Sequence, residues 1–145
     1  MSDIPMVLDM YTEGLKARDV DRVAATVADD LAVVLPERRL SKAQFLAMLR
    51  AMYAAFPDWH YEQEPVEVRG DVLAIRWRQG GTHTATFALP GLAPVAATGK
   101  KVQIPWHYFF YRVRGNQIVE IRPEPVPGGA PRGILEQIGA SLPPL

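Results

Sequence analysis

Apolar positions in the first part of the chain recur at the three- and four-residue intervals of helices. In residues 4–15 they form one stripe, which predicts an amphipathic helix. Asp19 precedes a second stretch with the same spacing, residues 20–27, and can cap a short helix there. The apolar run 31–35 ends at Pro36 and predicts a strand or an extended link.

A third helical pattern follows residue 41. Ser41 and Gln44 have the spacing of a capping box, in which each side chain accepts a hydrogen bond from the other residue's backbone N–H. Apolar side chains keep a helical period from Phe45 to Phe56. Pro57 cannot continue a helix, so the pattern predicts a third helix that ends before it.

Beyond Pro57 the apolar positions nearly alternate, as in strands with one buried face. Clusters of turn-forming residues separate five such stretches. The predicted strands are 59–68, 72–79, 82–89, 101–114 and 118–123. Helical spacing returns near the end, with Pro131 at a first helical position and a closing helix up to Gly139. The proline-rich tail, residues 140–145, is expected to be loose.

Helices followed by an antiparallel meander predict an α+β domain, with the helices packed against one face of a curved sheet. A chain of 145 residues, 48% of them hydrophobic, is long enough for one core. We therefore expect a single domain over residues 1–145.

Charge and composition argue against several classes of function. Sixteen basic and sixteen acidic residues cancel, and the longest basic runs are pairs, so neither nucleic acid nor an anionic membrane is an expected partner. Because the chain has no cysteine, it has no disulfide, thiolate nucleophile or cysteine metal site. The first residues lack a signal-peptide pattern and no apolar run is long enough to span a membrane, so a cytoplasmic location is expected.

Short motifs along nearly the whole chain resemble, in their order and spacing, those of the SnoaL-like polyketide cyclases. They are Ala55-Phe-Pro-Asp58, Gly81-Thr-His-Thr84, Ala97-Thr-Gly-Lys100, Tyr111-Arg-Val-Arg114 with Ile118-Val-Glu120, and Gly133-Ile-Leu-Glu-Gln-Ile-Gly139. The resemblance implies the cone of nuclear transport factor 2 and ketosteroid isomerase, with about three N-terminal helices on a strongly curved, mostly antiparallel sheet and a short C-terminal helix. It also implies an apolar pocket for a hydrophobic small molecule, a homodimer, and no metal or organic cofactor.

Family members close a ring by an intramolecular aldol reaction, in which a base removes a proton next to a carbonyl and an acid protonates the new alkoxide. The resemblance implies that a histidine and an aspartate on the last two long strands supply these groups. In a gapless alignment, these positions fall on Phe109 and Pro123, and neither side chain can transfer a proton. The family pair therefore does not carry over.

His107 is the candidate replacement. Side chains alternate along a strand, so His107 shares a face with Phe109 and Tyr111. An imidazole with a pKa near 6.5 can act as acid or base at neutral pH if a partner orients it, and Glu124 is the candidate partner. A two-residue turn at Gly115-Asn116 sets Glu124 opposite His107. A three-residue turn, which the alignment favours, directs Glu124 outward and leaves His107 to form hydrogen bonds within an apolar pocket.

Aromatic residues are expected to contact the ligand. Tyr11 and Tyr53 lie on the apolar stripes of their helices and can direct hydroxyls into the pocket. Trp77 and Trp106 can each form a pocket wall or a dimer face. The remaining expected ligand contacts are Phe109, Tyr111 and Pro123.

The other histidines are expected to be structural. His83 follows a turn and can satisfy backbone groups at a strand start, and alternation places His60 on the surface. Three scattered histidines without nearby carboxylates predict no metal site.

Three functions are compatible with this sequence. The first is a cofactor-independent enzyme of the cyclase type that uses acid/base chemistry on a hydrophobic small molecule. The second is a binding protein that uses the same pocket without turnover. The third is an epoxide hydrolase or isomerase of the same superfamily; epoxide hydrolysis needs carboxylates beside an arginine in the pocket. Glu120-Ile-Arg122-Pro-Glu124 has these residue types, but alternation places them on the outer face.

Overall fold

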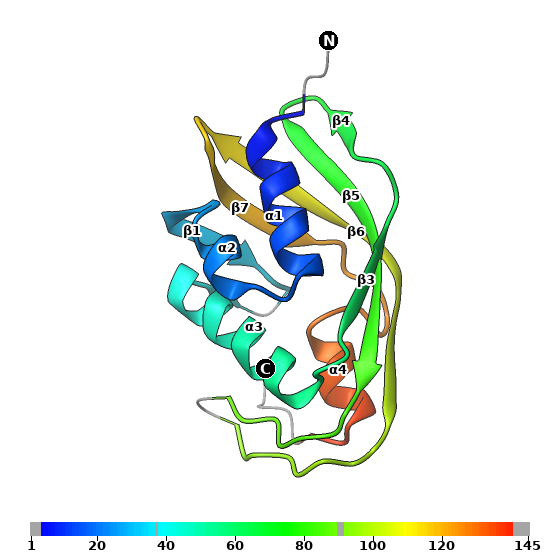
Figure 1. Ribbon diagram of the computed structural model, residues 1–145. Helices are drawn as coiled ribbons and strands as arrows, with labels where there is room; N and C mark the ends of the chain where they lie inside the picture. Colours follow the sequence, from blue (N-terminus) through cyan, green and yellow to red (C-terminus); the bar gives the residue numbers. More distant parts are fainter. Residues whose placement is uncertain (1–3, 37, 90–91, 141–145) are drawn as a thin grey trace.

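The computed structural model describes residues 4–36, 38–89 and 92–140. Most of the predicted loose tail, residues 141–145, lies outside the described residues. Three helices, α1 (Met6–Lys16), α2 (Val20–Ala24) and α3 (Lys42–Ala55), pack on one side of a curved, unclosed sheet (Figure 1). A fourth, α4 (Arg132–Gln137), follows the last strand in the chain and contacts β6. The architecture confirms the predicted α+β fold.

The sheet has seven strands in the order β2-β1-β7-β6-β5-β3, with β4 also paired to β5. Only the pairing of β1 with β7 is parallel among the described ladders. The strands are β1 (Val27–Val34), β2 (Arg39–Leu40), β3 (His60–Gln63), β4 (Glu67–Arg69), β5 (Val72–Thr82), β6 (Lys101–Arg114) and β7 (Gln117–Pro123).

Two of the predicted helix starts are confirmed. The Asp19 side chain accepts a hydrogen bond from the backbone N–H of Arg22 at the start of α2. Both hydrogen bonds of the capping box between Ser41 and Gln44 are present at the start of α3. Each bond satisfies a backbone donor that would otherwise lack a partner in the first helical turn. The apolar stripes of α1 and α3 then join the sheet in one core.

Several predicted strand boundaries are wrong. The stretch 59–68 is split into β3 and β4, with Pro65, which has no N–H for a ladder, in the gap. Residues 83–89 leave the sheet and form only an isolated bridge between Phe87 and Val95. The first strand starts at Val27, which the helical spacing had assigned to α2.

Gly80 and Gly81, which separate the predicted strands 72–79 and 82–89, lie instead inside β5. A side chain at Gly80 would place its Cβ 2.6 Å from the carbonyl oxygen of Val102 on β6. Glycine therefore permits a close approach of two strands at the bend of the sheet, which is a known use of glycine within strands.

A bulge in β6 changes which of its residues face inward. Trp77 pairs with His107, but Gln79 pairs with Ile104, so β6 has one extra residue at Pro105-Trp106. Before the bulge the even-numbered residues are buried, and after it the odd-numbered ones are. Proline is tolerated here because a bulge leaves one residue outside the ladder.

The turn between β6 and β7 combines the two predicted registers. Arg114 pairs with Gln117, as in a two-residue turn, with Gly115 in the left-handed conformation at φ 62°. A bulge at Val119 then shifts the register, so that Phe109 pairs with Pro123. Glu124 consequently lies opposite Tyr108, and its N–H donates to the Tyr108 carbonyl oxygen at 2.8 Å.

Candidate functional site

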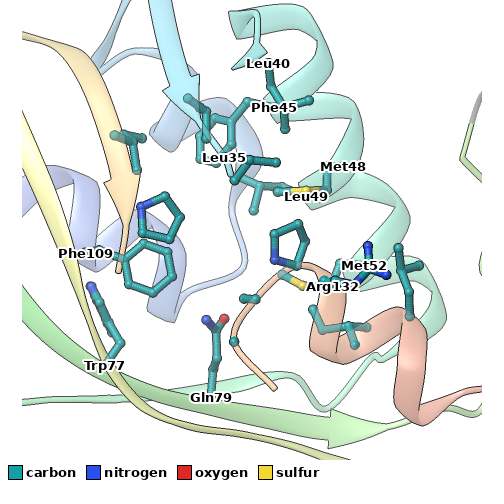
Figure 2. A pocket seen from close by; sticks show the side chains of 18 of the residues that line it. Leu35, Leu40, Phe45, Met48, Leu49, Met52, Trp77, Gln79, Phe109 and Arg132 are labelled. Carbon is teal, nitrogen blue, oxygen red and sulfur yellow. The ribbon is translucent and has the colours of Figure 1, made fainter. Parts of the chain in front are cut away.

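A cavity of about 570 Å³ lies between α3, the inner face of the sheet and the segment that follows β7. The α3 wall is apolar and consists mainly of Phe45, Met48, Leu49 and Met52 (Figure 2). The volume of the cavity and its largely apolar lining suit a small hydrophobic molecule.

Six of the nine site residues expected from the sequence line this cavity: Tyr11, Trp77, Phe109, Tyr111, Pro123 and Glu124. Three do not belong to the described lining. The Tyr53 hydroxyl lies 2.6 Å from that of Tyr61, which does line the cavity. Trp106 lies on the outer face, where the guanidinium carbons of Arg76 and Arg78 lie 5.1 and 5.3 Å from its ring centroid. His107 is the third.

His107 is buried behind the cavity wall, with 1% of its surface exposed. Its Nδ1 lies 3.2 Å from the backbone carbonyl oxygen of Glu124, and its Nε2 accepts a hydrogen bond from the Ala130 N–H at 3.4 Å. Because Nε2 accepts, the neutral ring carries its proton on Nδ1 and donates to the Glu124 carbonyl. Burial lowers the pKa of His107, against a smaller opposing effect of Glu124, so the imidazole is neutral at neutral pH.

The predicted pairing of the His107 imidazole with the Glu124 carboxylate is not formed. The Glu124 Oε1 atom accepts instead from the Tyr108 N–H at 3.3 Å. The shifted register of β7 causes this, because it sets Glu124 beside Tyr108. Among the described lining residues, Glu124 is the only carboxylate.

Buried hydroxyls form a polar group in the largely apolar cavity. Trp77 Nε1 donates to the Tyr111 hydroxyl at 2.9 Å, and the Tyr11 and Tyr111 hydroxyls also share a hydrogen bond. The rings of Tyr11 and Tyr111 meet edge to face, with centroids 5.5 Å apart. Because an indole N–H can only donate, the Tyr111 hydroxyl accepts from Trp77 and keeps its own proton for another acceptor.

Burial keeps these hydroxyls protonated. It raises the pKa of Tyr53 to about 12, against a smaller effect of the hydrogen bond between Tyr53 and Tyr61. It also raises the pKa values of Tyr11, Tyr61 and Tyr111 well above the usual range, because a phenolate would be poorly solvated there. The group therefore offers hydrogen-bond donors at neutral pH.

The polar lining residues that sequence reasoning missed include Tyr61 and Gln79. The signal for each was alternation: Tyr61 shares a strand face with Trp59, and Gln79 shares one with Trp77.

The remaining candidates lie away from the cavity. Glu120 and Arg122 line a separate groove on the outer face and lie 3.7 Å apart, so the carboxylate and arginine set needed for epoxide hydrolysis is not assembled inside. His83 is buried and stacks on Phe56. Its Nδ1 accepts a hydrogen bond from the Thr98 N–H at 3.2 Å, which joins the two ends of the segment 83–98 between β5 and β6. His60 is exposed.

The described part of the chain contains no group of three histidine, aspartate or glutamate side chains placed to hold a metal ion. None of its helices has the length and apolarity required to cross a bilayer.

The family model for the SnoaL-like polyketide cyclases matches residues 5–124. The chain belongs to this family. Among curated proteins, none matches the sequence. The membership agrees with the resemblance carried by the short motifs.

Solved structures share the fold at low sequence identity. AclR, a candidate hydroxylase from Streptomyces galilaeus, is 19% identical, with a TM-score of 0.71 over 92% of this chain and 93% of that one. A candidate SnoaL-like polyketide cyclase from Jannaschia sp. CCS1 is 20% identical, with a TM-score of 0.71 over 98% of both chains. A candidate polyketide cyclase from Xanthomonas campestris pv. campestris is 20% identical, with a TM-score of 0.63 over 91% and 93%. At these identities, the likeness shows the fold alone.

Proposed function

We propose that this SnoaL-like protein binds a hydrophobic carbonyl compound in the cavity and closes a ring in it by cofactor-independent acid/base chemistry. The observation that carries the proposal is the Tyr111 hydroxyl, a buried donor on the wall of an apolar cavity. A preorganised donor in a site of low polarity stabilises negative charge that develops on a carbonyl oxygen.

Glu124 takes the role of the base in this proposal. Its carboxylate removes a proton from the carbon next to one carbonyl, and the resulting enolate carbon forms a bond to a second carbonyl carbon. The alkoxide so formed takes up a proton, which returns the carboxylate to its starting state. Glu124 lies opposite Tyr108, three residues from Tyr111 along β6. That separation is roughly 10 Å at the usual strand rise, which suits a substrate of two rings.

His107 has a different role in this proposal from the one its position in the sequence predicted. Both of its ring nitrogens are engaged by backbone groups, so it holds the segment after β7 in place and does not transfer protons. It thereby positions Glu124, the first residue of that segment.

The test uses 4-phenylheptane-2,6-dione, a hydrophobic 1,5-diketone whose ring closure and loss of water give an absorbing cyclohexenone. We expect the wild type to accelerate this reaction. Glu124→Gln should lower kcat by about 10²-fold or more because the base is lost. Tyr111→Phe should lower it by a similar factor because the oxyanion loses a donor. Glu120→Gln, on the outer face, is the control and should retain the wild-type rate.

Non-catalytic binding is the second candidate, and a specific pair of residues favours it. Phe109 and Pro123 face each other across β6 and β7 at the positions that align with the family's acid/base pair, and both line the cavity. Two apolar side chains there suit retention of a ligand without chemistry. Saturable binding of the diketone without ring closure would contradict the enzymatic proposal and support this one.

We also propose that the protein forms a homodimer through the outer face of its sheet. Trp106, Tyr108 and Phe110 follow one another along that face of β6, and the rings of Tyr108 and Phe110 stack with centroids 6.0 Å apart. Ion pairs surround these aromatic residues, including Arg76 with Glu64 at 2.8 Å. A face with an aromatic row and both signs of charge can complement a second copy of itself.

A further inference from the structure

Gln79 is a buried polar side chain that the proposed chemistry leaves unused. It lies on β5, two residues after Trp77, and 7% of its surface is exposed. It also lines the cavity, and Figure 2 shows it rising from the strand toward the space beneath Leu49 and Met52. A buried glutamine in an apolar wall requires hydrogen-bond partners to offset its loss of water.

One end of the Gln79 amide is fixed. Trp59 Nε1 lies 3.2 Å from Gln79 Oε1. An indole N–H can only donate, so the atom that faces it must be the amide oxygen. Trp59 is itself fully buried and packs edge to face on Phe56, with centroids 5.2 Å apart. The donor therefore has no room to move, and it holds the amide in one orientation.

The other end of the amide has no acceptor among the described residues. No described residue accepts a hydrogen bond from the Nε2 of Gln79. This nitrogen is also absent from the fully enclosed polar atoms that lack a partner among the described residues, so it is open to the cavity. The α3 side chains that line the cavity are apolar except Gln44, whose amide oxygen already accepts from the Ser41 N–H. Arg132, which also lines the cavity, has only donors (Figure 2).

We infer that Gln79 is a specificity-determining residue that donates its amide N–H to an acceptor oxygen of the ligand. The ligand class is a hydrophobic ring compound with a carbonyl oxygen, or another oxygen that accepts, directed at β5. This contact is separate from the one to the Tyr111 hydroxyl, so the favoured ligand has two acceptor oxygens. The inference rests on the proposed function only in requiring that a hydrophobic ligand occupies the cavity.

The experiment compares two ring compounds of nearly the same shape, α-tetralone and tetralin, of which only the first has a carbonyl oxygen. Binding to the full chain is followed by ¹H–¹⁵N NMR, with the side-chain amide of Gln79 as the reporter. We expect α-tetralone to bind about 3- to 10-fold tighter, the range for one additional neutral hydrogen bond. Only α-tetralone should move the Gln79 amide protons downfield.

The variant Gln79→Glu provides the matched control. Because burial raises the pKa of a carboxyl group and a protonated carboxyl can donate, binding is compared at about pH 9, where the new side chain is ionised. The carboxylate keeps an oxygen opposite Trp59 Nε1 but has no hydrogen to donate, so the preference for α-tetralone should disappear or reverse, while tetralin still binds. Thermal unfolding checks that the variant is folded. If it is not, the wild-type comparison of the two ligands and the Gln79 amide shift still decide the inference.

The outcomes separate this inference from the proposed function. Equal affinities for the two ligands, with no shift of the Gln79 amide, would overturn the inference and leave the hydrophobic cavity as a binding site. Absence of binding by both ligands would overturn the inference together with the proposed function. A preference for α-tetralone that survives in Gln79→Glu would assign the contact to another donor and would also overturn it.

Discussion

At the scale of single residues, His107 illustrates how burial and backbone contacts define what a side chain can do. Its neutral ring donates to one carbonyl oxygen and accepts from the Ala130 N–H. Protonation would place a hydrogen on Nε2 against the hydrogen of that N–H, and it would also charge a buried ring. Both effects oppose the cation, in agreement with the lowered pKa.

Acid is therefore expected to destabilise the fold. Burial holds the pKa of His107 below its ordinary value of about 6.5 in the folded protein, so the unfolded chain binds protons first as pH falls. Stability should be complete above about pH 6.5 and should decline as pH falls toward the folded pKa, by at most about 1.4 kcal/mol per pH unit for each such histidine.

Urea unfolding at about pH 7.5 and about pH 5.5 measures this decline. His107→Gln should show a smaller decline than the wild type. Some decline should remain, because burial also lowers the pKa of His83. Equal declines in the two proteins would show that His107 does not contribute.

At the scale of elements, the bend between β5 and β6 shapes the cavity. Gly80 allows the strands to approach closely, and the Pro105-Trp106 bulge reverses the facing of β6 at the same place. As a result His107, Phe109 and Tyr111 face inward while Trp106 faces outward. The bend also sets the position of Gln79, which directly precedes Gly80.

Gly80→Ala is expected to destabilise the protein by about 1–3 kcal/mol, the usual cost of added volume where the backbone cannot give way. The added Cβ would lie 2.6 Å from the Val102 carbonyl oxygen, which is fixed in the ladder. Ala54→Ser, on the exposed side of α3, also adds one atom and should change stability by less than about 0.5 kcal/mol. Chemical denaturation compares the two; similar values would contradict the close-approach argument.

At the scale of the whole molecule, the two faces of the sheet carry different side chains. The inner face carries the cavity, and the outer face carries the aromatic row and its arginines, including Arg69 at 4.5 Å from the Tyr108 ring centroid. This division allows a dimer to form on the outer face without closing the ligand site. The proposed dimer and the proposed site are therefore testable independently.

We expect the wild type to sediment as a dimer and Phe110→Glu to shift it to the monomer, because a charge would be buried at the centre of the contact. Met6→Glu is the control, since Met6 lies on α1 and is 76% exposed. It should leave the dimer intact. A monomeric wild type, or a dimer that tolerates Phe110→Glu, would contradict the proposed interface.

The sequence by itself determined the local elements and the fold class. Caps and periodicity lie within a few residues of one another, so Asp19, Ser41 and Gln44 mark helix starts that the structure confirms. Alternation likewise predicted β6 and β7 nearly to the residue. The ordered short motifs indicated the family, and six of the nine expected site residues line the cavity.

Only the tertiary structure decided which side chains meet. Each bulge, at Pro105-Trp106 and at Val119, shifts a strand by one residue, and a shift of one residue reverses the faces of everything beyond it. The contact of His107 with a carbonyl in place of the Glu124 carboxylate follows from such a shift. The orientation of Gln79 depends on Trp59, 20 residues away, because a long-range contact fixes the amide and no local pattern encodes it.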